Sequence, residues 1–415
     1  MPLVLLAAAI ALSPGFSAGE IAGGRIIEIK IEDILIVVLG LTWIANLLIS
    51  GRKKIEKPPL FFPILAWLGI GLFSVLTNWL FMNIEISRGF FYFLKEIEFF
   101  FLYFYLFYHL KNIDSAKFII KIWIFLGLVN VGWVIYQLCK GIVGYYGPGA
   151  IGESEGPFPS GGFFLIIFIF LFNILLYYYF KLNISKLKKA ILSAFTVSPA
   201  LGVFASGSRA SGIGLLFAGF LTILFYFLKE KKKLKVFFIT ILVFIIFATV
   251  FIFFLTKIPA AKRLIGLEAF FWELSAKDSS TRFSIWKTQT LEAFKHPLFL
   301  FFGYGKSAAL VYEESHSQYV RNLVETGFIG SIVFLFLIFV IIKKSFKGFL
   351  SKKDPFIIGL SSGLFVATLT MLLISIPAEA FIVVKIAETY WFFAAITMAV
   401  LASKKQENVA SVSPK

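Results

Sequence analysis

The chain has 415 residues, of which 59% are hydrophobic and 15% charged, and phenylalanine alone contributes 53. So few charged residues cannot cover a folded surface, which excludes a set of ordinary soluble domains. The net charge of +17 does not indicate nucleic acid, because the basic residues lie mostly at the ends of apolar blocks, where membrane topology and anionic headgroups account for them. A membrane partner is expected, and no nucleic acid.

The apolar residues form blocks of about 17 to 25 residues, long enough for a helix to cross about 30 Å of hydrocarbon. We therefore predict an all-α polytopic protein with about twelve transmembrane helices, a single integral membrane domain over residues 1–415. The first block ends like a signal peptide but lacks a basic n-region, so we interpret it as a span. The predicted spans are 2–18, 33–50, 59–81, 89–110, 118–139, 161–180, 190–205, 211–228, 235–256, 317–342, 355–375 and 381–402.

Basic residues occupy every second connection between these spans. The largest groups lie at 52–57, 181–189, 229–235 and 343–353. By the positive-inside rule, we expect these connections, both termini and the tail at 403–415 on the cytoplasmic side. On the outer side, the Gly- and Pro-rich stretch 141–162 is expected to dip inward as a re-entrant segment.

One outer connection, residues 257–316 between the ninth and tenth spans, is too long to be a simple link, and functional residues concentrate in such segments. Within it, residues 281–295 have the pattern of an amphipathic helix with an aromatic side that includes Trp286. Gly303 and Gly305 would then let the chain turn back toward the next span.

Several kinds of chemistry are disfavoured by what the sequence lacks. Its four aspartates form no Asp-x-Asp motif, and there is no Walker-type phosphate loop. Its three histidines are not spaced as a zinc site, and the single cysteine, Cys139, can form no intrachain disulfide. We therefore expect an enzyme here to need no metal and no cofactor.

Two arginines on the predicted outer side have the chemistry of an anion site. Arg209 follows Ser206-Gly207-Ser208 at the start of a span, where Ser208 is a candidate helix cap and backbone N–H groups lie close to the guanidinium. Such a point suits phosphate oxygens, although contact with lipid headgroups is equally typical of an arginine there. Arg282, in the first turn of the predicted loop helix, opposes the helix dipole, a cost that a nearby anion would relieve.

His316 immediately precedes the tenth span. At about 100° per residue, it shares a helical stripe with Gly327 and Gly330, and these glycines would let a neighbouring helix approach closely. An ordinary imidazole, with a pKa of about 6.5, suits a general base that deprotonates a sugar hydroxyl, but a lone histidine is often structural. Arg321 is either a phosphate contact or the partner of Glu325, and the i,i+4 spacing favours the pairing.

These residues resemble the signature of O-antigen ligases, His-(Asn/Ser/Gln)-x9-Gly-x-x-(Gly/Thr/Tyr). The four matching residues are His316, Ser317, Gly327 and Gly330. The Ser-Arg element at Arg209 and the loop helix with Arg282 are similar to two further elements of that family, in the same order, within residues 160–400. The resemblance implies a GT-C-like glycosyltransferase in the bacterial inner membrane with its active site facing the periplasm.

The resemblance also implies a reaction and its partners. An O-antigen ligase moves a glycan from undecaprenyl diphosphate to the lipid A-core acceptor, by an inverting transfer without a metal. In this interpretation His316 is the general base, and Arg209 and Arg282 neutralise the departing diphosphate. The implied substrate contacts are Ser208, Ser317, Gln318 and Arg321, and the structural motif positions are Gly327 and Gly330.

The sequence is also compatible with other functions. A polymerase of the same family would join repeat units on the same lipid carrier. A lipid or polysaccharide transporter should show two similar halves, which this sequence lacks, and a non-catalytic scaffold would tolerate loss of all three site residues. Intramembrane charges need partners that the sequence does not identify: Lys95, Glu96, Glu98, Lys385 and Glu388.

Overall fold

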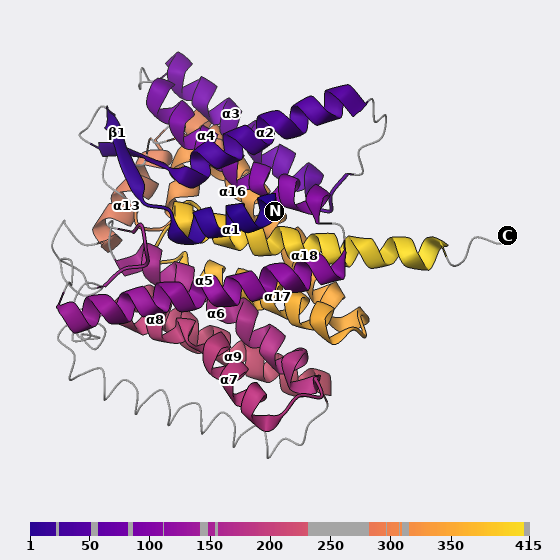
Figure 1. Cartoon of the computed structure of the whole chain (residues 1–415). Coiled ribbons are helices and arrows are strands. Elements are labelled where there is room, and N and C mark those ends of the chain that lie inside the picture. The colour runs from indigo at the N-terminus through magenta and orange to yellow at the C-terminus, as the bar shows by residue number, and fades with distance from the viewer. Residues whose placement is uncertain are drawn as a thin grey trace.

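The computed structural model shows a bundle of helices that run roughly parallel or antiparallel to one another (Figure 1). It describes residues 1–21, 25–50, 57–81, 86–110, 112–141, 148–153, 157–230, 282–295, 297–306, 308 and 315–410. The elements are α1 (Pro2–Leu12), β1 (Gly15–Ile21), β2 (Arg25–Lys30), α2 (Ile31–Ser50), α3 (Phe61–Phe81), α4 (Ile86–His109), α5 (Ile113–Lys140), α6 (Pro157–Tyr177), η1 (Tyr179–Lys181), α7 (Lys186–Val197), α8 (Pro199–Ala205), α9 (Arg209–Glu230), α13 (Arg282–Ala293), α14 (Pro297–Phe302), α16 (Gln318–Ser351), α17 (Pro355–Ile374) and α18 (Val384–Ala410).

Helices α6, α17 and α18 form the buried centre of the bundle. They are apolar on nearly every side because neighbouring helices cover their faces. Phe170 of α6 stacks on Phe393 of α18, with ring centroids 4.3 Å apart. Asn173 of α6 donates to Thr222 of α9 at 3.0 Å and accepts from Ser362 of α17 at 2.7 Å. One polar side chain thus joins three helices inside the bundle.

Within the described residues, eight helices are long and apolar enough to cross a membrane: α2, α5, α6 continued by η1, α7 continued by α8, α9, α16, α17 and α18. This confirms the predicted all-α multi-pass membrane protein. The predicted span at 235–256, and the part of the predicted outer loop up to residue 281, lie outside the described residues.

The first predicted span, 2–18, is wrong. Helix α1 ends at Leu12, because Pro14 disfavours helical backbone at Ser13. Its 11 residues rise about 16 Å, roughly half of the hydrocarbon thickness. The chain continues into the antiparallel hairpin of β1 and β2, which the sequence did not predict. The hydroxyl of Ser13 then accepts a hydrogen bond from the backbone of Ile31 at 2.8 Å, which ties the start of α2 to the end of α1.

Residues 148–153 pack inward, as the sequence predicts for this Gly- and Pro-rich connection. The side chain of Gln137 in α5 donates to the carbonyl of Gly149 at 3.2 Å and accepts from its amide at 3.0 Å. The ammonium of Lys385 in α18 donates to the carbonyl of Ile151. The segment therefore bridges α5 and α18.

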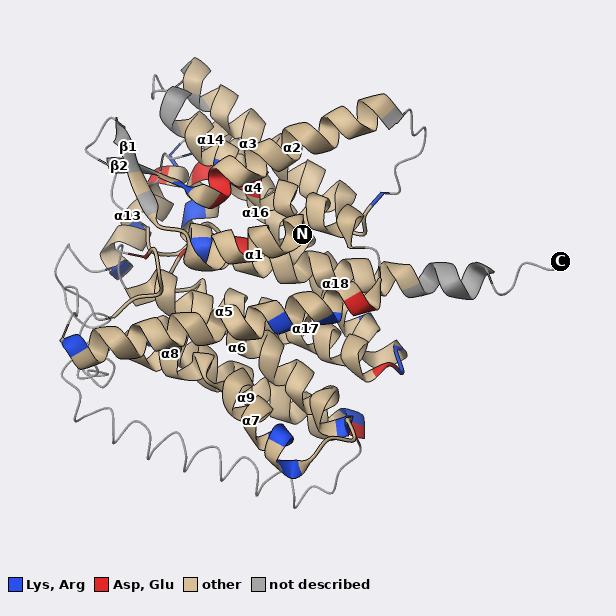
Figure 2. Ribbon diagram, viewed as in Figure 1, with Lys and Arg blue, Asp and Glu red and all other residues tan. Residues whose placement is uncertain are grey.

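The charged residues form two groups (Figure 2). Lysines lie at the end of the bundle where α9 and α16 end and α7 and α17 begin. A mixed group of acids and bases lies near β2 and α4, where Lys30 pairs with Glu153 at 2.8 Å and Lys95 pairs with Asp33 at 2.7 Å. This second group contains partners for several of the intramembrane charges.

Candidate active site

The start of α16 is held by the connection between α17 and α18, residues 375–383, hereafter the α17–α18 connection. The backbone amide of Gln318 donates to the carbonyls of Ser375 and Ala378, each at 3.1 Å. The backbone amide of Phe381 in turn donates to the side-chain oxygen of Gln318 at 3.2 Å. Gln318 is buried, so these bonds anchor the first residue of α16 from both sides.

Helix α13 confirms that a helix forms at the predicted place, but its buried residues are Gln289 and Ala293, while Phe283 of the predicted apolar side is exposed. The helix docks on the same connection. The guanidinium of Arg282 donates to the carbonyl of Pro377 at 3.1 Å. One turn later, the indole N–H of Trp286 donates to the carbonyl of Ser315 at 2.6 Å. The two bonds hold the arginine helix against the segment that leads into α16.

His316 lies in this leading segment. Helix α16 begins at Gln318 with Ser317 as its N-cap residue, so the predicted helical stripe does not extend to His316. His316 has a φ of +47° and is the one non-glycine residue with positive φ among the residues that the structure describes. Left-handed backbone costs a side-chain-bearing residue about 1–2 kcal/mol, and such strain is concentrated at functional sites. An irregular segment, rather than a helix, therefore sets the direction of this imidazole.

The signature glycines permit close contacts, as predicted, and one of them also breaks the helix. Gly327 has φ +67° and ψ −167°, which interrupts α16. A Cβ atom there would lie 2.4 Å from the carbonyl group of Phe301, and one on Gly303 would lie equally close to the backbone of α16. The chain after α14 thus crosses α16 backbone to backbone, where only glycines fit. A Cβ on Gly330 would lie 3.1 Å from Ile70 of α3.

The interruption is compensated by donors from outside α16. The carbonyl of Val324 accepts from the amide of Tyr304 at 2.7 Å, and that of Glu325 accepts from the amide of Gly305 at 3.0 Å. The hydroxyl of Ser74 in α3 also donates to the carbonyl of Glu325. Because backbone carbonyls inside a membrane protein need partners, these bonds fix the returning outer loop on the kink.

Glu379 of the α17–α18 connection was missed by the sequence analysis. Its carboxylate accepts from the hydroxyl of Ser315 at 2.9 Å and from the guanidinium of Arg321 at 2.6 Å. Arg321 also pairs with Glu325, Nε to Oε1 at 3.0 Å, which confirms the i,i+4 pairing, and its Cζ atom lies 5.3 Å from the centre of the Tyr92 ring. The available signal was a lone acidic residue after a proline in a short connection between two predicted spans.

Arg209 is the first residue of α9. Ser208 caps the helix as predicted, because its hydroxyl accepts from the amide of Ser211 at 3.3 Å. Gly214, five residues further along α9, packs on Ile374, the last residue of α17. A Cβ atom added to Gly214 would lie only 2.8 Å from the side chain of Ile374. The first turns of α9 therefore lie at the end of α17 from which the α17–α18 connection leaves.

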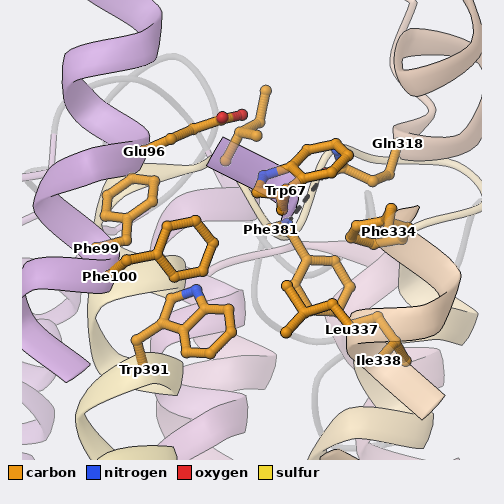
Figure 3. A pocket seen from close by; sticks show the side chains of 11 residues that line it. Trp67, Glu96, Phe99, Phe100, Gln318, Phe334, Leu337, Ile338, Phe381 and Trp391 are labelled. Carbon is orange, nitrogen blue, oxygen red and sulfur yellow. Dashed lines mark hydrogen bonds between the residues drawn. The ribbon is translucent and has the colours of Figure 1, made fainter. Parts of the chain in front are cut away.

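A small apolar pocket, part of it open to solvent, lies beside Gln318 (Figure 3). Its aromatic lining comprises Trp67, Phe99, Phe100, Phe334, Phe381 and Trp391. The acidic residue in the lining, Glu96, pairs with Lys306 at 2.5 Å. Lys306 follows the crossing over α16 and is buried, so the outer loop supplies the partner that the sequence left unidentified for Glu96.

The comparison with protein families bears directly on this end of the bundle. Residues 192–335 match the family model described as O-antigen ligase. The match covers about a third of the chain and identifies that segment as similar to O-antigen ligases. The O-antigen ligase match begins within α7, ends within α16, and contains Arg209, Arg282 and His316. No curated protein matches the chain.

Several parts of the site lie outside the O-antigen ligase match. The α17–α18 connection with Glu379 follows it, and α3 and α4, which line the pocket, precede it. The matched segment thus carries the three residues that the sequence analysis selected, while the rest of the chain supplies contacts that position two of them.

Proposed function

We propose that this protein transfers a glycan from undecaprenyl diphosphate to the lipid A-core oligosaccharide at the periplasmic face of the bacterial inner membrane. One observation carries the proposal: the α17–α18 connection binds both the helix of Arg282 and the segment that contains His316. Arg209 approaches the same end of the bundle on α9. A site at the end of a membrane bundle is at the level where the diphosphate of a lipid carrier lies.

Arg209 and Arg282 would bind the diphosphate. Arg282 is exposed and Arg209 is partly exposed, so both side chains have surface for a ligand, whereas the guanidinium of Arg321 is buried between two carboxylates. A guanidinium can hold two phosphate oxygens at once, and its charge stabilises the diphosphate as it leaves. The aromatic pocket next to Gln318 gives the site an apolar border, where such charge stabilisation is stronger than in water.

His316 would act as the general base. In an inverting transfer, an acceptor hydroxyl attacks the anomeric carbon, its proton passes to the imidazole, and the bond from that carbon to the diphosphate oxygen breaks. The segment that contains His316 is held on both sides. Ser315 is bonded to Trp286 and Glu379, and the backbone amide of Gln318 is bonded to the α17–α18 connection. Fixed neighbours on both sides reduce the reorganisation needed during the reaction.

The proposal is tested by reconstituting the purified chain with a lipid-linked oligosaccharide and two acceptors in parallel, lipid A-core and a second lipid-linked repeat unit. Glycosylated lipid A-core is the expected product. A ladder of longer glycans on the carrier lipid would instead establish a polymerase. His316→Ala should abolish the product, and His109→Ala, which removes an imidazole from the far end of α4, should not.

A further inference from the structure

A group of buried and partly buried carboxylates lies where α2, α4 and α18 meet, outside the residues that the proposed reaction uses. Asp33, Glu98 and Glu388 each place a carboxylate oxygen within 4.8 Å of the others. Glu388 is fully buried, and neither of its oxygens has a hydrogen-bond partner. Glu98 Oε1 and Glu32 Oε2 also lack one. Unpartnered buried carboxylate oxygens are costly, so this arrangement calls for a ligand.

Acidic side chains outnumber basic ones around these carboxylates. Five acidic and three basic side chains interact electrostatically here: Glu32, Asp33, Glu98, Glu153 and Glu388 with Lys30, Lys95 and Lys385. With every group ionised, the cluster has an excess of two negative charges.

The arrangement of these carboxylates suits a shared metal cation. Neither oxygen of Glu388 has a hydrogen-bond partner among the described residues. Oxygens that share a Ca²⁺ ion at about 2.3–2.6 Å lie about 3.3–4.5 Å from one another, and the three carboxylates here each place an oxygen within 4.8 Å of the others. Lys95 bonds to Glu98 Oε2 and leaves Glu98 Oε1 available.

We propose that Asp33, Glu98 and Glu388 form a binding site for one divalent cation, Ca²⁺ or Mg²⁺. Oxygen ligands without nitrogen or sulfur select these hard ions. The cation would neutralise the cluster and tie α2 and α4 to the second turn of α18, shortly after the α17–α18 connection. The three residues are far apart in the sequence, which explains why motif spacing indicated no metal. This site is independent of the proposed glycan transfer.

Equilibrium dialysis of the full chain tests the site directly. The protein is purified in non-ionic detergent without anionic lipid, treated with EDTA, freed of EDTA, and titrated with Ca²⁺ and, separately, Mg²⁺. We expect about one ion bound per chain and a rise in the thermal unfolding temperature with ion concentration. Glu388→Gln, which keeps the shape of the side chain, should weaken binding by at least about tenfold. Asp114→Asn, an exposed acid at the start of α5, is the matched control and should bind normally.

Three outcomes would overturn the site. The first is that the unsubstituted chain binds no ion at an ion concentration of about 5 mM, which is above the range of most protein Ca²⁺ sites. The second is that Glu388→Gln binds the ion as tightly as the unsubstituted chain. The third is that acid pH alone stabilises the protein, which would mean that protons neutralise the cluster. If Glu388→Gln does not fold, Glu98→Gln replaces it. Glycan transfer is assayed on the same samples, so a failed cation site and a failed transferase proposal give different results.

Discussion

Replacing His316 by glycine separates the loss of the imidazole from any effect on the backbone. At a φ of +47°, glycine is free of the steric cost that histidine and alanine both bear. We therefore expect His316→Gly to lose catalysis while it keeps or gains stability. His316→Ala should lose catalysis equally but keep the strain, so the pair of variants distinguishes a base from a structural residue.

The magnitudes follow from the backbone angle. Relief of the left-handed strain contributes about 1–2 kcal/mol to stability. Glycine's greater freedom in the unfolded chain removes about 0.5–1 kcal/mol of that gain. The free energy of unfolding of His316→Gly should therefore change by about 0 to +1.5 kcal/mol. Loss of a general base should lower turnover by about 10² to 10⁴, which corresponds to about 2.7–5.5 kcal/mol in activation free energy.

Two measurements check this result. Single-turnover transfer from a lipid-linked oligosaccharide gives the chemical step, and tryptophan fluorescence during heating gives the stability of each variant. Donor binding should be nearly unchanged in both. Turnover by His316→Gly within about threefold of the unsubstituted enzyme would exclude the general-base role, because that role accounts for about 100-fold or more. A glycine variant less stable than the alanine variant would contradict the strain argument.

Three further substitutions test the site and its support. Gly327→Ala should lower the free energy of unfolding by about 3 kcal/mol or more, because its Cβ would meet the Phe301 backbone at 2.4 Å. Gly132→Ala, which has open space around it, should raise the free energy of unfolding by up to about 1 kcal/mol. Equal unfolding temperatures of the two variants would refute the close crossing of the chain at Gly327. Arg321→Ala should lower the free energy of unfolding by about 3–5 kcal/mol, because the carboxylates of Glu325 and Glu379 lose their ion-pair partner. An unchanged thermal unfolding transition would mean that these two carboxyl groups are neutral. Arg209→Lys should weaken donor binding about tenfold or more in a lipid-diphosphate binding assay, and undiminished affinity would show that a point charge suffices.

Local signals in the sequence determined the class of the protein and most of its elements. Long apolar blocks predict spanning helices because a helix satisfies its own backbone hydrogen bonds, which lipid cannot do. The amphipathic pattern before Pro297 predicted α13, and the cap at Ser208 was recognisable from residue type and position alone. The early end of α1 was also encoded locally, by Pro14.

The signature glycines show where local reasoning stopped. The spacing of Gly327 and Gly330 predicted a close neighbour, and both positions have one. It did not predict that Gly327 breaks the helix, nor that the neighbour is the loop at Gly303. The conformation of a glycine depends on the backbone packed against it, and that backbone lies elsewhere in the chain.

Only the tertiary structure decided which charges meet. Lys306 reaches Glu96, and Glu379 reaches Arg321, across long stretches of sequence, and Glu388 lies beside carboxylates from two other helices. A buried charge is costly without a partner, but composition and periodicity indicate only that the need exists. The partner is set by how the helices pack and where the loops return. Those contacts join residues that no local pattern relates.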